Sequence, residues 1–369
     1  MWLEQLEGRD FRNYRTFSLQ PHPGLNIVCG RNAQGKSNLI EACYMLLRGF
    51  SYRAVRQGEV IAWGARGTEV KGVLHTPAGR VEVAFALGPE GRRSTLAGEN
   101  VSRCALGAET GLVLFTPDDL WLIKSGPQYR RRFMDLELGP LRPGYLDDIQ
   151  AYRRAVAQRN ALLRAPAPSK DPSFALWTEQ VARYGARVVV TRLEILRRLA
   201  PAVAGAYAAW TGAGGGEELG LRYLSAVELA GLTEADVAEA LLKALETAYP
   251  RDTGSGQTTV GPHRDDLGLT LGGRPARLFA SQGQQRSIIL ALKMAQLNLW
   301  RERLGSDPIV LLDDVLYELD EGRQERLLAG LRGRGQAFIT VNRDSLAAGY
   351  GDRVFYVEEG RILKKGDEG

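Results

Sequence analysis

Hydrophobic and polar residues alternate along much of the first third of the chain. Segments 69–75 and 80–87 carry apolar and β-branched residues at every second position, between turns rich in Gly and Pro, and 111–115 is a further short apolar run. A period of two residues is typical of strands, because successive side chains point to opposite faces of a sheet. We therefore expect this part of the chain to be rich in strands.

The pattern changes to a helical period after about residue 128. Apolar residues recur at helical spacing over 150–163 and 174–209, with arginines between them, and a proline-rich break at 165–172 separates the two segments. This arrangement predicts a helical hairpin and not a long coiled coil. Two shorter elements follow, a strand at 220–224 and a helix at 233–249.

Helices and strands alternate again toward the C-terminus, which places the chain in the α/β class. We expect residues 1–117 and 305–369 to form one lobe with a mixed sheet, and residues 118–304 to form a helical second lobe. A chain of 369 residues with 44% hydrophobic and 25% charged residues is long enough for such a division and has the composition of a globular protein.

Charge and cysteine content limit the classes of protein to which the chain can belong. Only eight of the 48 basic residues are lysines, which leaves 40 arginines against 43 acidic residues. Arginine suits bidentate phosphate contacts, so nucleic acid is one explanation, and a genome-wide composition bias is another. Three cysteines are too few for a disulfide framework, and neither a signal sequence nor a long apolar run is visible. We expect a cytoplasmic protein.

Residues 30–37 form a complete G-x-x-x-x-G-K-S phosphate-binding loop between a predicted strand at 25–29 and a predicted helix at 38–47. The glycines let backbone N–H groups point at phosphates, Lys36 reaches the β and γ phosphates, and the Ser37 hydroxyl binds Mg²⁺. The motif therefore predicts ATP and Mg²⁺ as ligands. Its residues are Gly30, Arg31, Asn32, Ala33, Gln34, Gly35, Lys36 and Ser37.

Four apolar residues at 309–312 precede two carboxylates, as expected for a buried parallel strand that ends at a magnesium site. Asp313 is predicted to bind Mg²⁺ opposite Ser37, and Asp314 to polarise the attacking water. Taken alone, the pattern also fits a core strand that ends in a surface acid. The phosphate-binding loop in the same chain favours the nucleotide site.

A third segment, 281–286, opens a predicted helix and is similar to the signature motif of ABC-type ATPases, with Ser281, Gly283 and Gln284 matching. Ser281 is a good helix N-cap, and Gly283 lets a phosphate come close. The residues at 318–320, Glu-Leu-Asp, resemble the D-loop of the same ATPases. An ordinary helix cap is the plainer interpretation, but the position just ahead of the Asp313 strand favours the signature motif.

Further motifs resemble the RecF family of bacterial recombination mediators, which have SMC-like ATPase heads. The similarity runs from Leu6 to about Leu363, and the 244 positions between Ser37 and Ser281 leave no room for the long coiled coil of SMC proteins. The segments that carry the resemblance are 11–14, 124–127, 130–135, 261–267, 279–286 and 311–320.

The resemblance implies an ATP-driven homodimer that holds two nucleotides between subunits. Lys36 and Ser37 of one chain would face Ser281 and Gly283 of the other, and Arg12 is expected to contact the nucleotide as well. It also implies binding of double-stranded DNA and of junctions between single- and double-stranded DNA, RecR as a partner, and help in loading RecA during repair and replication-fork recovery. No membrane is implied.

Three departures from the general ABC pattern suggest slow hydrolysis. Asp314 stands where transporter subunits carry a glutamate, no histidine follows the predicted strand at 337–340, and no glutamine follows Phe115. Thr340 or Asn342 occupies the place of the histidine. An ATPase subunit of a membrane transporter is the alternative function, but it should carry the missing histidine and glutamine. An SMC-like nuclease-associated head would need a longer coiled coil or an acidic nuclease domain.

The roles of two polar clusters remain open. Arg130, Arg131 and Arg132 are either a DNA contact or a solvated basic turn. The run His263-Arg264-Asp265-Asp266 has poor spacing for a metal site, because neighbours on an extended chain point apart. We expect a structural or switch loop there.

Overall fold

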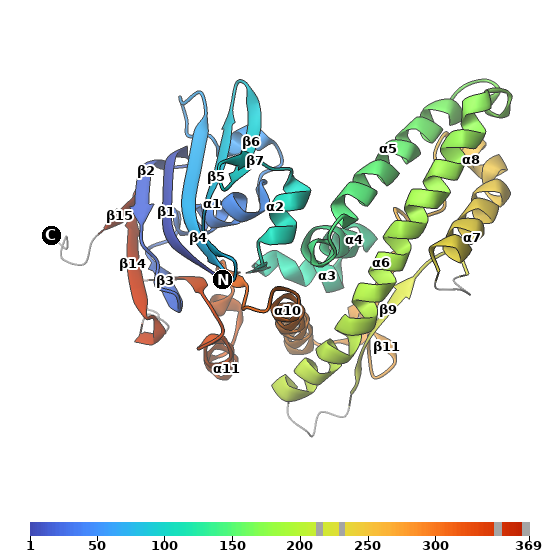
Figure 1. Ribbon diagram of the computed structural model, residues 1–369. Helices are drawn as coiled ribbons and strands as arrows, with labels where there is room; N and C mark the ends of the chain where they lie inside the picture. Colours follow the sequence, from blue (N-terminus) through green and yellow to red (C-terminus); the bar gives the residue numbers. More distant parts are fainter. Residues whose placement is uncertain (212–216, 229–232, 343–348, 364–369) are drawn as a thin grey trace. The chain divides into compact units, whose positions relative to one another are not determined.

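The computed structural model describes residues 1–211, 217–228, 233–342 and 349–363. Contacts divide the chain into unit 1, which comprises Met1–Asp119 and Gln296–Gly369, and unit 2, which comprises Leu120–Ala295. Helix α10, Gln282–Leu304, begins in unit 2 and ends in unit 1. This division differs from the boundaries expected at 117 and 304 mainly in how α10 is assigned. Figure 1 shows strands β1 to β7 in unit 1 and the long helices α5 and α6 in unit 2.

An antiparallel sheet forms one layer of unit 1, with the strand order β2-β1-β4-β5-β6-β7. Its strands are β1 (Trp2–Phe11), β2 (Tyr14–Leu19), β4 (Thr68–Thr76), β5 (Gly79–Gly88), β6 (Gly91–Leu96) and β7 (Glu99–Asn100). The strands predicted at 69–75 and 80–87 are confirmed as β4 and β5. Buried residues alternate with more exposed ones along β4 and β5, as the period of two requires.

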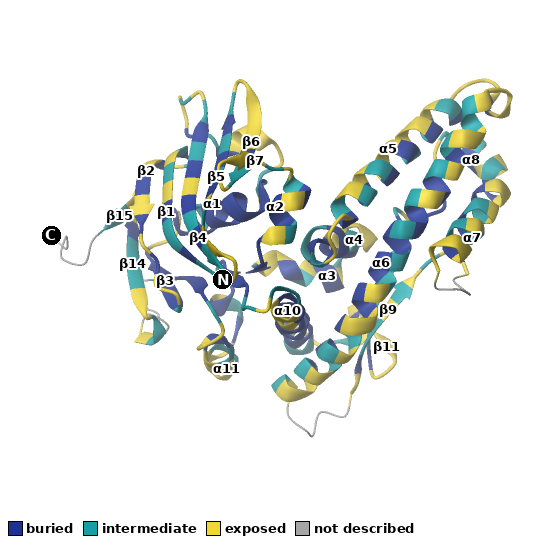
Figure 2. Ribbon diagram, viewed as in Figure 1, coloured by how far each residue is buried: buried dark blue, intermediate teal, exposed yellow. Residues whose placement is uncertain are grey.

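A second sheet has the order β15-β14-β3-β13-β12-β8. It contains β3 (Leu25–Cys29), β8 (Leu112–Phe115), β12 (Ile309–Leu312), β13 (Ala337–Val341), β14 (Arg353–Glu358) and β15 (Arg361–Leu363). All its pairs are parallel except β14 with β15. Every residue of β3, β8, β12 and β13 is buried, which explains why these strands are apolar except for Asn26 and Thr340. Figure 2 labels β3 and shows its burial.

Helix α1, Lys36–Arg48, packs against strands of both sheets and joins them into one core. Eleven of its 13 residues are buried, so its sequence is apolar on nearly all sides. At its C-terminal end the buried Arg48 donates hydrogen bonds to the carbonyl oxygens of Thr110 and Leu112. These bonds tie the helix to the start of β8. Among its described residues, unit 1 also contains the α-helices α2 (Arg103–Glu109) and α11 (Glu321–Leu331), besides the end of α10.

Unit 2 is built on an antiparallel helical hairpin of α5 (Tyr145–Leu163) and α6 (Pro172–Thr211), so the predicted hairpin is confirmed. Helix α7, Glu234–Thr247, packs on α6, and Thr233 caps it by accepting a hydrogen bond from the N–H of Asp236.

A three-stranded sheet in unit 2 has the order β11-β10-β9. The remaining elements are α3 (Trp121–Lys124), α4 (Pro127–Phe133), α8 (Tyr249–Ser255), β9 (Leu219–Leu224), β10 (Asp266–Leu271), β11 (Arg274–Pro275) and α9 (Ala276–Phe279). Within the described ranges, no helix combines the length and apolar character needed to cross a membrane.

Candidate functional site

The phosphate-binding loop joins the end of β3 to the start of α1. A side chain at Gly30 would lie 2.4 Å from the carbonyl oxygen of Val357, and Gly35 has a φ of +122°. Both positions therefore require glycine, the first for close packing and the second for its backbone conformation. No side chain caps the N-terminus of α1, so its first N–H groups remain available to an anion.

Two neighbouring segments brace the loop from outside. The Asn13 amide donates a hydrogen bond of 2.9 Å to the carbonyl oxygen of Gln34, and the Tyr14 hydroxyl donates one of 3.0 Å to that of Gly35. From the turn between β14 and β15, the N–H of Gly360 donates a 3.0 Å bond to the same Gln34 oxygen. The loop therefore has a defined shape before any ligand binds.

The Lys36 ammonium lies over its own loop. It donates hydrogen bonds of 2.9 Å and 3.0 Å to the carbonyl oxygens of Gly30 and Arg31, and one of 3.4 Å to the side-chain oxygen of Asn342. Although Lys36 is buried, its side chain lines the cavity described below. The charge is thus placed where phosphate oxygens would meet it.

Asp313 follows β12 directly, and its backbone N–H donates a hydrogen bond to Phe115 of β8. Its carboxylate accepts a 2.7 Å hydrogen bond from the Tyr52 hydroxyl at Oδ2. Oδ1 is buried and accepts no hydrogen bond from any residue that the structure describes. Burial raises the pKa of Asp313, and polar contacts from Tyr52 and Ser37 oppose that rise.

These side chains fit a magnesium ion. Hard cations prefer oxygen ligands, and a buried carboxylate oxygen without a donor is costly unless a ligand satisfies it. The free Oδ1 of Asp313 and the adjacent Ser37 hydroxyl are the two groups that would hold the ion.

Asp314 has a φ of +55°, in the left-handed region that few non-glycine residues adopt. Thr340 of β13 holds this conformation, because its hydroxyl oxygen accepts a 2.8 Å hydrogen bond from the N–H of Asp314 and its hydroxyl lies 3.2 Å from Oδ1 of the same residue. Strained backbone of this kind is concentrated at functional sites. The conformation presents the carboxylate to the cavity.

A cavity of about 620 Å³ lies at this edge of the parallel sheet, within the size range of ligand pockets. Its lining brings together six of the predicted site residues: Asn32, Ala33, Gly35, Lys36, Ser37 and Asp314. Asn342 also lines it, so both residues considered for the place of the missing histidine, Thr340 and Asn342, lie at the site.

Arg12, the predicted nucleotide contact of the β1–β2 turn, forms an ion pair with Glu41 of α1. It has a φ of +53° in the β1–β2 turn, and its guanidinium donates hydrogen bonds of 2.9 Å and 2.7 Å to the two carboxylate oxygens of Glu41. Glu41 lies on α1 and is fully buried. Arg12 therefore neutralises a buried carboxylate beside the site, and it is not among the residues that line the cavity.

Two residues of the site carry no sequence signal that could have revealed them. Arg53 lines the cavity and lies 3.9 Å from Oε2 of Glu41, and Tyr52 binds Asp313. Both belong to the irregular segment after α1, which has no motif. Only the tertiary path of that segment brings an arginine and a tyrosine to the site.

The predicted signature segment lies in unit 2 at the start of α10. The Ser281 hydroxyl oxygen accepts a 3.2 Å hydrogen bond from the N–H of Gln284, and the Gln284 side chain accepts one of 2.8 Å from the N–H of Ser281. This reciprocal pair is a capping box, so the predicted N-cap is confirmed. Ser281 is exposed and Gly283 partly exposed, which leaves the first turn of α10 accessible.

The three consecutive arginines of α4 have different environments. Arg130 is buried, binds both oxygens of Asp266 at 2.8 Å, and donates to the carbonyl oxygens of Leu122 and Ser125. This geometry argues against Arg130 as a DNA contact, because its guanidinium already stabilises unit 2. Arg131 and Arg132 line a cavity of about 370 Å³, and Arg132 is exposed. They are the members of the group that a phosphate could reach.

The segment around His263 is part of a buried hydrogen-bond network. His263 Nδ1 lies 2.5 Å from the Tyr152 hydroxyl, and Nε2 lies 2.9 Å from the carbonyl oxygen of Thr258. Burial lowers the pKa of His263 to about 4, so the ring is neutral at physiological pH. Asp265 accepts hydrogen bonds from Tyr223 and Ser225. The contacts agree with a structural role for this loop.

Comparisons with known proteins match the whole chain. A family model described as the RecF/RecN/SMC N terminal domain matches residues 2–361. The DNA replication and repair protein RecF of Desulforudis audaxviator (strain MP104C) is 45% identical over 366 residues, which cover 99% of this chain and all of that protein. RecF of Anaeromyxobacter dehalogenans (strain 2CP-C) is 41% identical over 370 residues, with 96% and 97% of the two chains covered.

Solved structures agree with these relatives. A structure of the recombination mediator protein RecF with ATPrS, in the RecFOR pathway, has a TM-score of 0.91 at 29% identity and covers 99% of this chain and 98% of that one. An Smc head bound to the C-winged helix domain of ScpA has a TM-score of 0.57 at 16% identity and covers 98% and 97%, which supports a shared fold alone.

The fold and the sequence matches thus define an SMC-like, ABC-type ATPase head with a helical second lobe, and the described residues contain no long coiled coil. Within this class the chain belongs to the RecF family.

Proposed function

We propose that this protein binds DNA in an ATP-dependent manner during recombinational repair and replication-fork recovery. The observation that carries the proposal is the cavity beside the phosphate-binding loop, which Lys36, Ser37 and Asp314 line, with the buried Asp313 carboxylate next to Ser37. The full-length relatives are DNA replication and repair proteins, and a similar solved structure contains RecF with ATP. These relatives give no support to the transporter alternative.

The residues of the site have distinct roles in nucleotide binding. The loop N–H groups and the α1 terminus bind phosphate oxygens, and Lys36 neutralises the β and γ phosphates. Ser37 and Asp313 would hold Mg²⁺, and a bound ion would supply positive charge beside the transferred phosphate. Asp314 would orient the attacking water, and its side chain, shorter than a glutamate, should make hydrolysis slow, as suits an ATPase that acts as a switch.

We place the second half of each nucleotide site on another copy of this chain. The first turn of α10 offers exposed N–H groups and the Ser281 hydroxyl to a γ-phosphate of the partner. Leu278 and Phe279, just before this turn, are 73% and 60% exposed, which is unusual for large apolar side chains. An ATP-driven homodimer would cover them together with the signature segment.

The DNA partners would be duplex DNA and its junctions with single strands. Arg131 and Arg132 supply phosphate contacts in unit 2. The RecFOR pathway named for the similar structure supports RecR as the protein partner. The outcome that we propose is RecA loading.

A gel-shift series tests this function. Duplex, single-stranded and gapped DNA are compared with and without ATP, using the parent protein and Lys36→Met. ATP should strengthen binding of the parent to duplex and gapped DNA, and Lys36→Met should lose this stimulation. Lys243→Met is the matched control, because Lys243 is exposed on α7. Unchanged ATP stimulation in Lys36→Met would show that the phosphate loop does not control DNA binding.

A further inference from the structure

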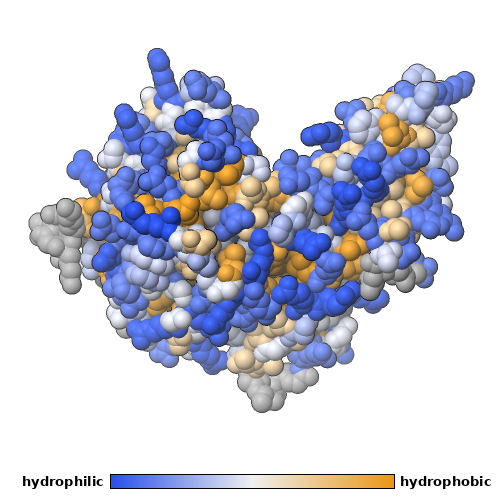
Figure 3. Space-filling model, viewed as in Figure 1, coloured by the Kyte–Doolittle hydropathy of each residue, from blue (hydrophilic) through white to orange (hydrophobic). Residues whose placement is uncertain are grey.

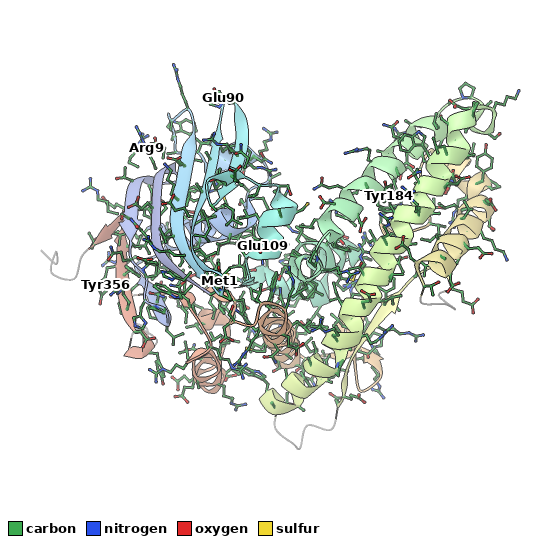
Figure 4. All side chains as sticks on the ribbon, in the orientation of Figure 1. Met1, Arg9, Glu90, Glu109, Tyr184 and Tyr356 are labelled. Atoms are coloured by element: carbon green, nitrogen blue, oxygen red, sulfur yellow. The ribbon has the colours of Figure 1, made fainter. Side chains whose placement is uncertain are left out.

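One end of the antiparallel sheet of unit 1 carries an open, arginine-rich cleft that the nucleotide site does not use. Its volume is about 1060 Å³, and it lies where β1 and β5 end and where β2, β4 and β6 begin. Figure 4 labels Arg9 and Glu90 at this end of the sheet, and Figure 3 shows mainly hydrophilic surface there. The arginines that line the cleft are Arg9, Arg15, Arg66, Arg92 and Arg93.

The cleft is positively charged. Its five arginines exceed its three acids, which are Asp10, Glu69 and Glu90. Asp10 lies 3.6 Å from Arg9 and 3.3 Å from Arg15, so one carboxylate is shared by two arginines. Within the part of the chain that the structure describes, Arg66 and Arg93 form no ion pair, and both are exposed. Their guanidinium groups are available to phosphates.

An exposed aromatic ring stands at the rim of this cleft. Trp63 is 95% exposed and directly precedes Gly64, which lines the cleft. The two occupy the corner of a turn closed by a 2.9 Å hydrogen bond from the N–H of Ala65 to the carbonyl oxygen of Ala62, with Gly64 at a φ of +80°.

The turn is also fixed to the sheet. The Arg15 guanidinium donates a 3.1 Å hydrogen bond to the carbonyl oxygen of Trp63. The N–H of Ala62 donates one of 2.8 Å to the backbone carbonyl oxygen of Asp10. The indole is therefore exposed to solvent on an ordered backbone. Packing in the core does not explain why a tryptophan occupies this position. A large, fully exposed aromatic ring is a common binding element.

We infer that this cleft binds single-stranded nucleic acid, with a base stacked on Trp63 and phosphates on Arg66 and Arg93. Exposed aromatic rings beside a basic groove are how proteins bind single strands, because every unpaired base offers a face for stacking. Bases within a duplex are already stacked, so a duplex could use the arginines but not the indole. The inference takes from the proposed function only that DNA is the partner. It would give the protein a contact to the single-stranded side of a junction.

The test measures binding of a fluorescent oligothymidylate to the nucleotide-free, full-length protein by anisotropy. Trp63→Ala should weaken binding roughly 5- to 150-fold, the range that corresponds to losing one stacked base. Trp63→Phe should stay closer to the parent. Arg66→Gln combined with Arg93→Gln should lower the slope of log affinity against log salt by about 1.4, because each phosphate contact on a single strand adds about 0.7.

Two controls make the result specific. Trp121→Ala removes a tryptophan that is 46% exposed in unit 2, and it should bind the oligonucleotide like the parent. Lys36→Met should also keep oligonucleotide binding while it loses ATP-stimulated duplex binding, so failure of the proposed function can be told from failure of this inference. Parent-like oligonucleotide affinity in Trp63→Ala, or an equal loss of duplex affinity in that variant, would overturn the single-strand site.

Discussion

The Tyr52 hydroxyl donates a 2.7 Å hydrogen bond to Oδ2 of Asp313. This contact joins the segment after α1 to the end of β12, and it satisfies one carboxylate oxygen while the other stays without a hydrogen bond from the described residues. An oxygen that is oriented but unsatisfied is suited to a metal. Groups that orient a metal-binding carboxylate commonly affect metal affinity as the direct ligands do.

We predict that Tyr52→Phe lowers the affinity for Mg²⁺ in ATP binding by about 10- to 100-fold. This is the usual cost of losing a group that orients a metal ligand. Fluorescent ATP titrations at graded Mg²⁺ concentrations measure this. Tyr129→Phe, at a half-exposed position of α4, is the matched control. If both variants show the parent's magnesium dependence, Asp313 does not bind the ion through this arrangement.

Asp314→Asn should slow ATP hydrolysis about 10²- to 10⁴-fold, the range expected for a residue that accepts a proton from the attacking water. The amide keeps the size of the side chain and loses its charge, so ATP-bound complexes with DNA should last longer. Phosphate release and DNA dissociation are the two measurements, and Asp118→Asn, an exposed acid of the same unit, is the control. Normal turnover in Asp314→Asn would show that another residue positions the water.

Ser281→Arg should leave nucleotide binding by the monomer intact and block ATP-driven dimerisation, because its side chain would occupy the space of the partner's phosphate. Light scattering with and without ATP provides the measurement. Ser281→Ala is the matched control, since it removes the cap, at a cost of about 1 kcal/mol, without adding bulk. A variant with arginine that dimerises like the parent would refute the shared nucleotide site.

The lowered pKa of His263 predicts that the stability of the protein depends on pH. Its pKa is about 4 in the folded protein and 6.5 in the reference state, so at pH values between these the unfolded chain binds the proton more readily. The contribution of this residue to the free energy of unfolding is fully present above about pH 6.5 and is lost as the pH falls toward about 4. We expect a loss of about 2 kcal/mol between about pH 7 and about pH 5.

Urea unfolding at the two pH values measures this effect. The His263→Gln variant removes the titrating ring, so the difference between its pH dependence and that of the parent isolates the contribution of His263 from those of other titrating groups. Identical pH dependence in the two proteins would contradict a neutral, partly buried His263.

Arg130 and Arg132 should separate stability from DNA binding. Arg130→Ala leaves the Asp266 carboxylate without its partner and should cost about 3 kcal/mol, since breaking a largely buried ion pair is strongly destabilising. Arg132→Ala should keep the parent's stability and lower the salt slope of duplex binding by about 0.9. Urea titration and salt-dependent anisotropy test the two effects. A reduced salt slope in a fully folded Arg130→Ala would assign the DNA contact to that residue.

The sequence alone determined the local elements of this protein. The period of two in β4 and β5, the apolar runs of β3 and β12, and the proline break before α6 all predicted what the structure contains. The phosphate loop and the Ser281 cap were equally visible. Each depends on neighbours in the chain, because strand alternation, glycine turns and helix caps involve only a few consecutive residues.

Only the tertiary structure decided how distant segments meet. Tyr52 reaches Asp313, Thr340 holds Asp314 in the left-handed region, and Asp266 removes Arg130 from solvent. No local pattern encodes these contacts. Parallel pairing of β3, β13 and β12 brings the loop and the carboxylates to one edge, and burial then determines which side chains lose water and need partners. For that reason the motif residues could be predicted from the sequence, and the residues that orient them could not.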